Sequence, residues 1–174
     1  MENIQENTED ILGSDTGPEE PFPIYLSGKV VMVVKGYGRG TKELQIPTVG
    51  ANISEENTLE LFSYIESGIY YGWGRVVIED EEDNNVYAMV MSLGWNPYYN
   101  NTKRSAEIHF IHKFKNTFYG EEIRVIIMGF IRPERNYVSK ELLIKDIQKD
   151  IRMAQQSLER KTYSIYKENK FLEK

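Results

Sequence analysis

Cysteine is absent from the 174 residues. The chain can therefore form neither disulfide bonds nor thiolate metal sites, and it has no cysteine nucleophile. Long hydrophobic runs are absent too, because no stretch approaches the ~20 apolar residues that a membrane-spanning helix needs. The first residues, MENIQENTEDILG, have neither the basic nor the apolar part of a secretion signal. We therefore expect a cytoplasmic protein with no membrane partner.

Positive charge is missing from the N-terminal segment. Residues 1–20 contain seven acids and no lysine or arginine, so a net charge of −6 for the whole chain becomes +1 for the remaining 154 residues. A nearly neutral domain lacks the strong positive field of a general nucleic-acid-binding protein, so we expect no nucleic-acid partner. Because the segment is acidic and low in apolar content, residues 1–21 are predicted to be disordered. We favour a solubilising role for them over partner binding.

The rest of the sequence contains a series of short β-type runs. They are rich in β-branched and aromatic residues or alternate in polarity, and turn-forming residues separate them. The predicted strands are 29–34, an extended segment 45–53, 68–79, 86–94, 106–114 and a run within 118–132. Strands at such short spacing predict an antiparallel barrel rather than a sheet of alternating strands and helices. The acidic stretch EDEEDNN at 79–85 is interpreted as a solvated hairpin tip.

The periodicity changes near the end of the chain. Apolar residues recur at helical spacing at Leu143, Ile147, Ile151, Ala154 and Leu158. This single apolar stripe predicts a helix packed on the barrel, with Ser139 as its N-cap. We therefore divide the chain into the N-terminal segment 1–21, a barrel domain with its helix at 22–160, and a C-terminal tail at 161–174.

A glycine-rich stretch, GYGRGTKELQIPT, occupies residues 36–48. It does not match the Walker A spacing, and the G-x-G-x-x-G motif fails because Thr41 stands where the third glycine belongs. Glycines still let backbone N–H groups approach an anion closely, and Arg39 and Lys42 would add positive charge. A phosphate-binding loop and a plain turn between strands both fit these residues.

Several polar residues lie in or near the predicted strand 106–114. His109 and His112 are three residues apart, which on a strand places them on opposite faces, so we do not expect a metal-binding pair. Phe110 and His112 share a face, where they either stack on an aromatic ligand or fill the core. Glu107 is either a general base or a surface ion-pair partner, and the sequence alone leaves both open.

A loop that mixes aromatic and basic residues, WNPYYNNTKRS, occupies residues 95–105. Such residues either stack on the bases of single-stranded nucleic acid or form a mobile lid over a small ligand. The nearly neutral domain favours the lid.

Taken in their order, several of these stretches resemble one family. GYGRGTKEL…IPT, GIYYGWGRV, VMSLGWNPYYNNTKRSAEIHFIH, FYGEEIRV and GFIRPERNY are similar to the corresponding segments of eukaryotic-type riboflavin kinase (flavokinase). The resemblance extends from about Pro23 to Leu158 and is most specific between Ser92 and Gly120. It implies a mostly β protein: a single-domain, six-stranded antiparallel Greek-key β-barrel with a C-terminal α-helix. The implied reaction transfers the γ-phosphate of ATP to the 5′-hydroxyl of riboflavin, giving FMN and ADP.

The resemblance also implies roles for individual residues. Glu107 would be the base on the ribityl 5′-hydroxyl, and Mg²⁺, or Zn²⁺ as in some members, would bind at Thr48 and Asn52 together with the terminal phosphates. The implied ATP-binding residues are Gly36, Gly38, Arg39, Gly40, Lys42, Phe110, His112 and Tyr119. The implied flavin-binding residues are Arg132, Arg135 and Tyr137, with residues 95–105 as a flexible flavin loop. We expect a monofunctional, monomeric enzyme.

Two departures from the family pattern concern the first two strands. Val49 and Gly50 interrupt the Pro-Thr-Ala-Asn motif, and the first strand has the additional residues Met32-Val33-Val34. The first insertion moves Asn52 about 7 Å further from Thr48 along a regular strand. We therefore expect a bulge at Gly50 that keeps both side chains on one ion. A catalytically silent flavin- or nucleotide-binding barrel and a nucleic-acid-binding barrel remain the alternatives.

Overall fold

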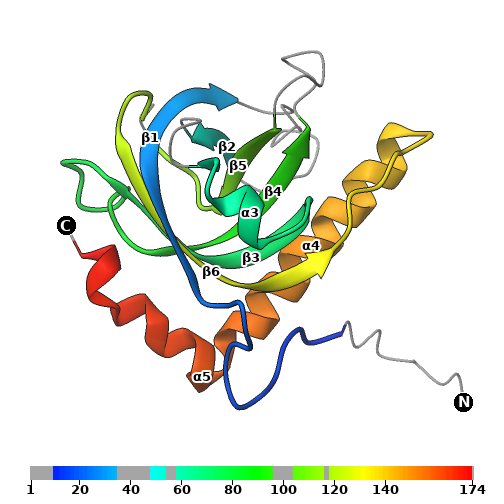
Figure 1. Ribbon diagram of the computed structural model, residues 1–174. Helices are drawn as coiled ribbons and strands as arrows, with labels where there is room; N and C mark the ends of the chain where they lie inside the picture. The colour runs from blue at the N-terminus through cyan, green and yellow to red at the C-terminus, as the bar shows by residue number, and fades with distance from the viewer. Residues whose placement is uncertain (1–9, 35–47, 54–57, 96–103, 116–117, 174) are drawn as a thin grey trace, which may run out of the picture.

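The computed structural model describes residues 10–34, 48–53, 58–95, 104–115 and 118–173. Its six strands form a closed antiparallel barrel in the order β1-β2-β5-β4-β3-β6 (Figure 1). The strands are β1 Ile24–Val34, β2 Thr48–Ile53, β3 Gly68–Val77, β4 Tyr87–Trp95, β5 Arg104–Ile111 and β6 Glu122–Arg132. This confirms the six-stranded antiparallel barrel with a C-terminal α-helix that the sequence predicts.

The long helix follows the last strand and crosses the outside of the barrel (Figure 1). Ser139 caps it as predicted, because its side chain accepts a hydrogen bond from the N–H of Leu142. The helices are α3 Leu61–Tyr64, α4 Lys140–Glu159 and α5 Lys161–Ser164, followed by the 3-10 helices η2 Ile165–Glu168 and η3 Lys170–Leu172. The predicted tail is therefore helical up to Leu172, whose side chain is buried. No described helix is both long and apolar enough to cross a membrane.

Two apolar clusters lie on opposite sides of the barrel wall. The interior contains Ala106, Ile108 and Phe110 of β5, each fully buried, whereas Val90 of β4 packs outside, in one cluster with Ile151 of α4. Because successive strand residues face opposite sides, the alternation of β5 places Glu107 and His109 on the outer face. The alternating pattern thus directs the polar side chains of β5 away from the core.

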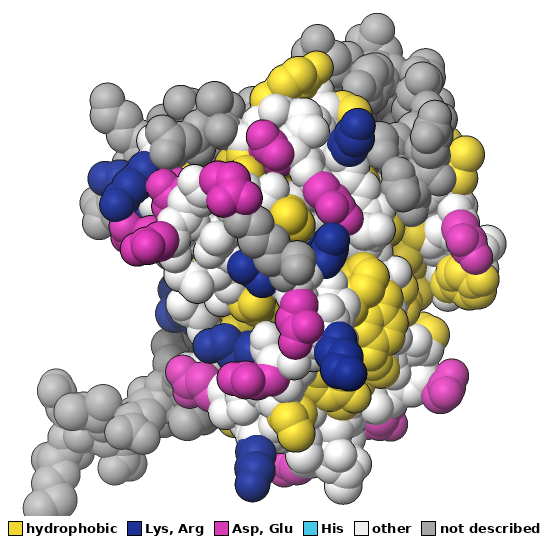
Figure 2. Space-filling model, turned by 90° about the vertical axis from the view of Figure 1, so that its left-hand side faces the viewer, with side chains coloured by type: hydrophobic (Ala, Val, Ile, Leu, Met, Phe, Trp, Pro, Cys, Tyr) yellow, Lys and Arg dark blue, Asp and Glu magenta, His cyan; other side chains and the backbone are white. Residues whose placement is uncertain are grey.

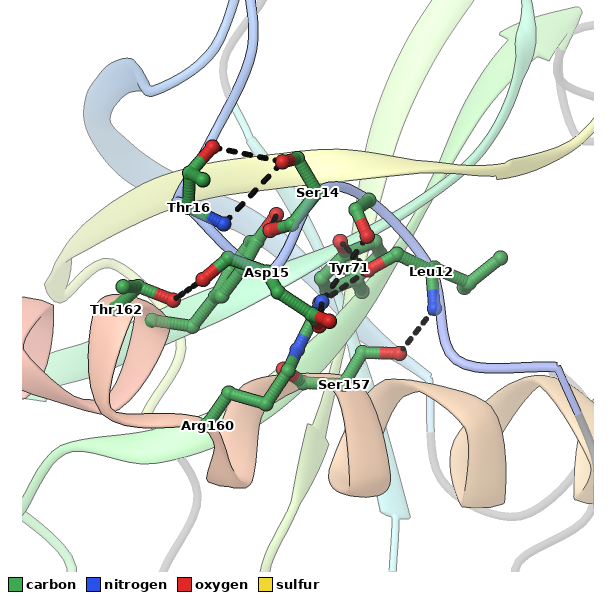
Figure 3. Close-up of polar contacts among 10 residues, drawn as sticks. Leu12, Ser14, Asp15, Thr16, Tyr71, Ser157, Arg160 and Thr162 are labelled. Atoms are coloured by element: carbon green, nitrogen blue, oxygen red, sulfur yellow. Dashed lines mark hydrogen bonds and ion pairs between the residues drawn. The ribbon is translucent and has the colours of Figure 1, made fainter.

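The N-terminal segment lies against the junction of α4 and α5 (Figure 3). The N–H of Leu12 donates to Ser157 Oγ (2.9 Å), the hydroxyl of Tyr163 donates to the carbonyl of Ser14 (2.9 Å), and Arg160 pairs with Asp15 (2.9 Å). Residues 12–15, part of the segment predicted to be disordered, therefore have fixed partners, and residues 1–9 lie outside the described residues. These partners are almost the whole chain away, so composition does not reveal them.

The bulge predicted at Gly50 is not where the sequence placed it. From Thr48 to Asn52, strand β2 pairs with β5 without a register shift. The irregularity lies on β1 instead, where Val30 and Met32 pair with Ile53 and Asn52, so that Val31 is the additional residue. The extra segment of β1 pairs directly with β2: Met32 with Asn52, Val33 with Ala51, Val34 with Gly50. The two insertions thus lengthen one antiparallel pair of strands together.

The surface charges reflect the nearly neutral composition of the domain. On the face shown in Figure 2, acidic and basic side chains are interspersed around exposed hydrophobic area. The acidic stretch 79–85 is predicted from its sequence to be a solvated hairpin tip. Asp83 within it departs from that prediction, because its side chain is fully buried.

Candidate active site

The outer faces of β2, β5 and β4 bring polar residues side by side. In the strand register, Glu107 lies opposite Asn52 on one side and opposite Ser92 on the other. Directly opposed residues in antiparallel strands have Cβ atoms about 4.5–5.5 Å apart, so these side chains are neighbours. The structure therefore brings together the predicted base and one predicted metal ligand, which are 55 residues apart in the sequence.

Asn52 is the most unusual of these residues. Its side chain is only 3% exposed, and neither its amide oxygen nor its amide nitrogen has a hydrogen-bond partner among the described residues. Leaving a buried polar group unsatisfied costs about 1–3 kcal/mol, so such groups indicate an interaction with something else. An amide oxygen is one of the oxygen ligands that Mg²⁺ accepts. Asn52 therefore fits as one ligand of the expected metal.

Thr48 does not share this position. It lies four residues from Asn52 along an unbroken ladder, which corresponds to roughly 13 Å at 3.3 Å per strand residue. With these backbone positions the two residues do not bind one ion directly. The expectation that both bind the same ion therefore depended on a bulge at Gly50 that the register does not contain.

Glu107 has a second polar neighbour on the same strand. The imidazole Nε2 of His109 lies 3.2 Å from Glu107 Oε1, and both side chains are 22% exposed. A partly exposed carboxylate is accessible to a substrate and can accept a proton from it. Sequence analysis identified Glu107 but assigned no role to His109.

The predicted ATP-binding residues that the structure describes occupy three different environments. Phe110 is fully buried in the barrel interior, where it contacts Phe114 and Phe118 edge-on as part of an aromatic cluster. His112 follows the end of β5, and Tyr119 is 66% exposed in the turn before β6. The remaining predicted ATP-binding residues, Gly36, Gly38, Arg39, Gly40 and Lys42, lie outside the described residues.

The predicted flavin-binding residues lie together beside α4. The single Nε–H of Arg132 is shared between the two carboxylate oxygens of Asp150 (3.0 and 3.1 Å), and Nη2 donates to Oδ2 (2.8 Å). Asp146, one helical turn earlier, accepts from the Tyr137 hydroxyl at 2.7 Å and from Arg135 at 2.9 Å. Burial, with the hydrogen bond to Asp146, raises the pKa of Tyr137 to about 12, so the phenol stays neutral. Sequence analysis missed both aspartates, although their i, i+4 spacing places them on one face of the predicted helix.

The two ends of the predicted flavin loop, residues 95–105, meet as paired strand residues. Trp95 lies opposite Arg104, and the guanidinium of Arg104 lies 5.0 Å from the Trp95 ring and 5.7 Å from the Phe62 ring. Next to them, a Cβ at Gly94 would lie 1.9 Å from Glu134 Oε1, so a larger residue there would displace that carboxylate. Residues 96–103 lie outside the described residues. The described part shows how β4 and β5 hold both ends of this loop.

Known proteins resemble this chain in sequence and in fold. The family model for riboflavin kinase (flavokinase) matches residues 20–158. A riboflavin kinase of Pyricularia oryzae is 46% identical over 164 residues, covering 88% of this chain and 80% of the relative. The human riboflavin kinase is 46% identical over 152 residues, covering 87% and 92%. A crystal structure of riboflavin kinase from Trypanosoma brucei, 24% identical, covers 90% of this chain and 91% of its own with a TM-score of 0.67, which supports the fold. The chain belongs to the riboflavin kinase family.

Proposed function

We propose that the protein transfers the γ-phosphoryl group of ATP to the 5′-hydroxyl of riboflavin, giving FMN and ADP. The observation that carries this proposal within the structure is the pairing of Glu107 with the buried, unpartnered amide of Asn52. The family match and the barrel support the same reaction.

Glu107 would act as the general base. Its carboxylate takes the proton of the ribityl hydroxyl as the oxygen–phosphorus bond forms and the bond to the β-phosphate oxygen breaks. General-base catalysis of this kind contributes about 10²–10⁴-fold to a rate. Phosphoryl transfer otherwise depends on alignment and charge neutralisation more than on covalent help.

In this proposal, different residues bind the metal and the phosphates. Asn52 would hold Mg²⁺, which when bound neutralises charge on the phosphate oxygens. Thr48 would contact the terminal phosphates from further along β2. Lys42 and the glycines of residues 36–40 would hold the remaining phosphates. Zn²⁺ is the alternative metal.

The flavin would lie against the segment after β6. Arg135 and Tyr137 would contact it, and Arg132, whose charge is already paired with Asp150, would hold this segment on α4 while it contributes to the flavin site. We propose a monofunctional monomer in the cytoplasm, with ATP and riboflavin as its small-molecule partners and without nucleic-acid or membrane partners. The nearly neutral domain supports the expectation of no nucleic-acid partner, and the absence of cysteine suits a reducing compartment.

The test is a chromatographic assay of purified protein with riboflavin, ATP and either Mg²⁺ or Zn²⁺. We expect FMN only when ATP and metal are both present. Glu107→Gln should lower kcat about 10²–10⁴-fold and retain FMN binding by fluorescence quenching. Glu121→Gln, an equal change at an exposed position, is the matched control.

Two results would contradict parts of the proposal. FMN binding without FMN formation by the wild-type protein, with either metal, would favour the catalytically silent barrel. A wild-type kcat in Glu107→Gln would remove Glu107 from the mechanism and leave the family assignment in place.

A further inference from the structure

The acidic connection between β3 and β4 contains one carboxylate that is unlike its neighbours. Of the five consecutive acids at residues 79–83, only Asp83 is buried, with none of its side chain exposed. Its Oδ1 lies 3.0 Å from His112 Nε2, and its Oδ2 accepts the backbone N–H of Lys115 at 2.9 Å. A buried carboxylate is costly unless it is paired and hydrogen-bonded, so this one is held in place by defined partners.

Hydrogen bonds within the connection between β3 and β4 hold Asp83 in its buried position. Asp80 Oδ1 accepts the N–H groups of Glu82 (3.0 Å) and Asp83 (2.8 Å), and these two hydrogen bonds lower the pKa of Asp80. The amide of Asn85 donates to the carbonyls of Glu81 and Glu82. The turn is therefore closed by its own polar groups, and one of its carboxylates is left to reach the segment after β5.

His112 is fixed in two independent ways. Its ring stacks on Tyr87 with centroids 3.8 Å apart and planes 8° apart, and Phe114 meets it edge-on at 4.7 Å. The stack on Tyr87 fixes the orientation of the ring plane, and the contact with Asp83 fixes the direction in which Nε2 points within that plane. An ionised carboxylate only accepts hydrogen bonds, so beside an ionised Asp83 a neutral His112 ring would carry its proton on Nε2 and keep Nδ1 as an acceptor.

We propose that Asp83 is a positioning residue for nucleotide binding, which acts by fixing the ring orientation and tautomer of His112. The proposal rests on the proposed function, together with the ATP-binding role of His112 that the riboflavin kinase resemblance implies. An imidazole whose Nδ1 is held as an acceptor can receive a hydrogen bond from an amino group, such as the 6-amino group of adenine. The acidic hairpin would then contribute to ATP binding without touching ATP.

The test measures ADP binding, which requires no turnover, for Asp83→Asn, His112→Ala and the double variant. Asn keeps an acceptor for the Lys115 N–H but can present an amide N–H₂ to His112. We expect Asp83→Asn to weaken ADP about tenfold, the scale of one hydrogen bond to a charged group, and to raise the KM for ATP more than that for riboflavin. In protein that already carries His112→Ala, Asp83→Asn should cause no further weakening of ADP binding, because its effect passes through His112. Glu81→Gln, an exposed acid of the same hairpin, is the matched control and should bind ADP normally.

A second measurement uses the wild-type protein, so it does not depend on whether the variants fold. The chain has only two histidines, so nitrogen NMR resolves His112 from His109. We expect the Nε2–H tautomer at His112, and a change in its Nδ1 signal when ADP is added.

Three outcomes overturn the proposal: equal weakening by Asp83→Asn with and without His112, an unchanged His112 signal in the ADP complex, or ADP binding that His112→Ala leaves unaltered. If FMN still forms in these cases, riboflavin kinase activity stands without this role. If no FMN forms, the proposed function fails, and ADP binding still decides the role of Asp83.

Discussion

Two acidic regions, the N-terminal segment and the hairpin at 79–85, look alike in the sequence and differ in the structure. In each, one aspartate pairs with a basic or imidazole side chain far along the chain. Asp15 pairs with Arg160 but its side chain remains 91% exposed, whereas Asp83 pairs with His112 and is fully buried. Surface ion pairs contribute little to stability, while breaking a buried pair leaves groups unsatisfied. Position in the fold, and not charge density, therefore decides what an acid contributes.

The largest expected effect comes from removing the buried carboxylate. Asp83→Ala leaves the His112 Nε2–H and the Lys115 N–H without their acceptor in a buried place, so we expect a loss of about 2–4 kcal/mol in the free energy of unfolding. Urea denaturation measures it, with Glu81→Ala as the exposed control. A loss equal to that of the control would show that the two acids do not differ.

The next effect concerns the partner of the exposed acid. Arg160 donates to the carbonyls of Leu12 and Gly13 as well as to Asp15, and its guanidinium lies 4.1 Å from the Tyr163 ring centroid. We expect Arg160→Ala to cost about 1–2 kcal/mol through these contacts and to speed hydrogen exchange at residues 12–15. Unaltered exchange would show that the segment is held without Arg160.

A third aspartate, Asp146, is intermediate in exposure and tests the comparison by pH. Burial alone would raise the pKa of Asp146, but the hydrogen bond from Tyr137 and the pairing with Arg135 hold it below its usual 3.8. A carboxyl with a depressed pKa in the folded state stabilises the protein above its unfolded pKa, and this contribution is lost as pH falls through the folded pKa. The stability difference between wild type and Asp146→Asn should therefore be constant above about pH 5 and shrink below pH 4. Urea midpoints across pH 3–7 measure it, and a constant difference down to pH 3 would contradict it.

The smallest effect is expected at the exposed acid itself. Asp15→Ala removes only the solvent-screened part of the Arg160 contacts, so we expect the Tm to remain within experimental error of wild type. Differential scanning calorimetry of Asp15→Ala beside Arg160→Ala measures the two together. A Tm loss as large as that of Arg160→Ala would mean that the ion pair, and not the backbone carbonyls, holds the N-terminal segment.

The sequence predicts those features that depend on neighbouring residues. Ser139 as N-cap follows from its residue type, and the apolar stripe of α4 follows from local periodicity; both agree with the structure. The burial of Asp83 does not follow, because its partners His112 and Lys115 are 29 and 32 residues away and the acids beside it are exposed. The Arg132–Asp150 pair was missed for the same reason, since it links the end of β6 to the middle of α4.

The paired lengthening of β1 and β2 has a consequence for how this barrel can be rebuilt. The additional segment of β1 is one residue longer than that of β2, and the bulge at Val31 takes up this difference. Deleting Val49 and Gly50 alone would leave backbone groups of β1 without partners, whereas exchanging both segments together preserves closure. A chimera that imports residues 30–53 as one unit would keep its register, and one that imports either strand by itself would not.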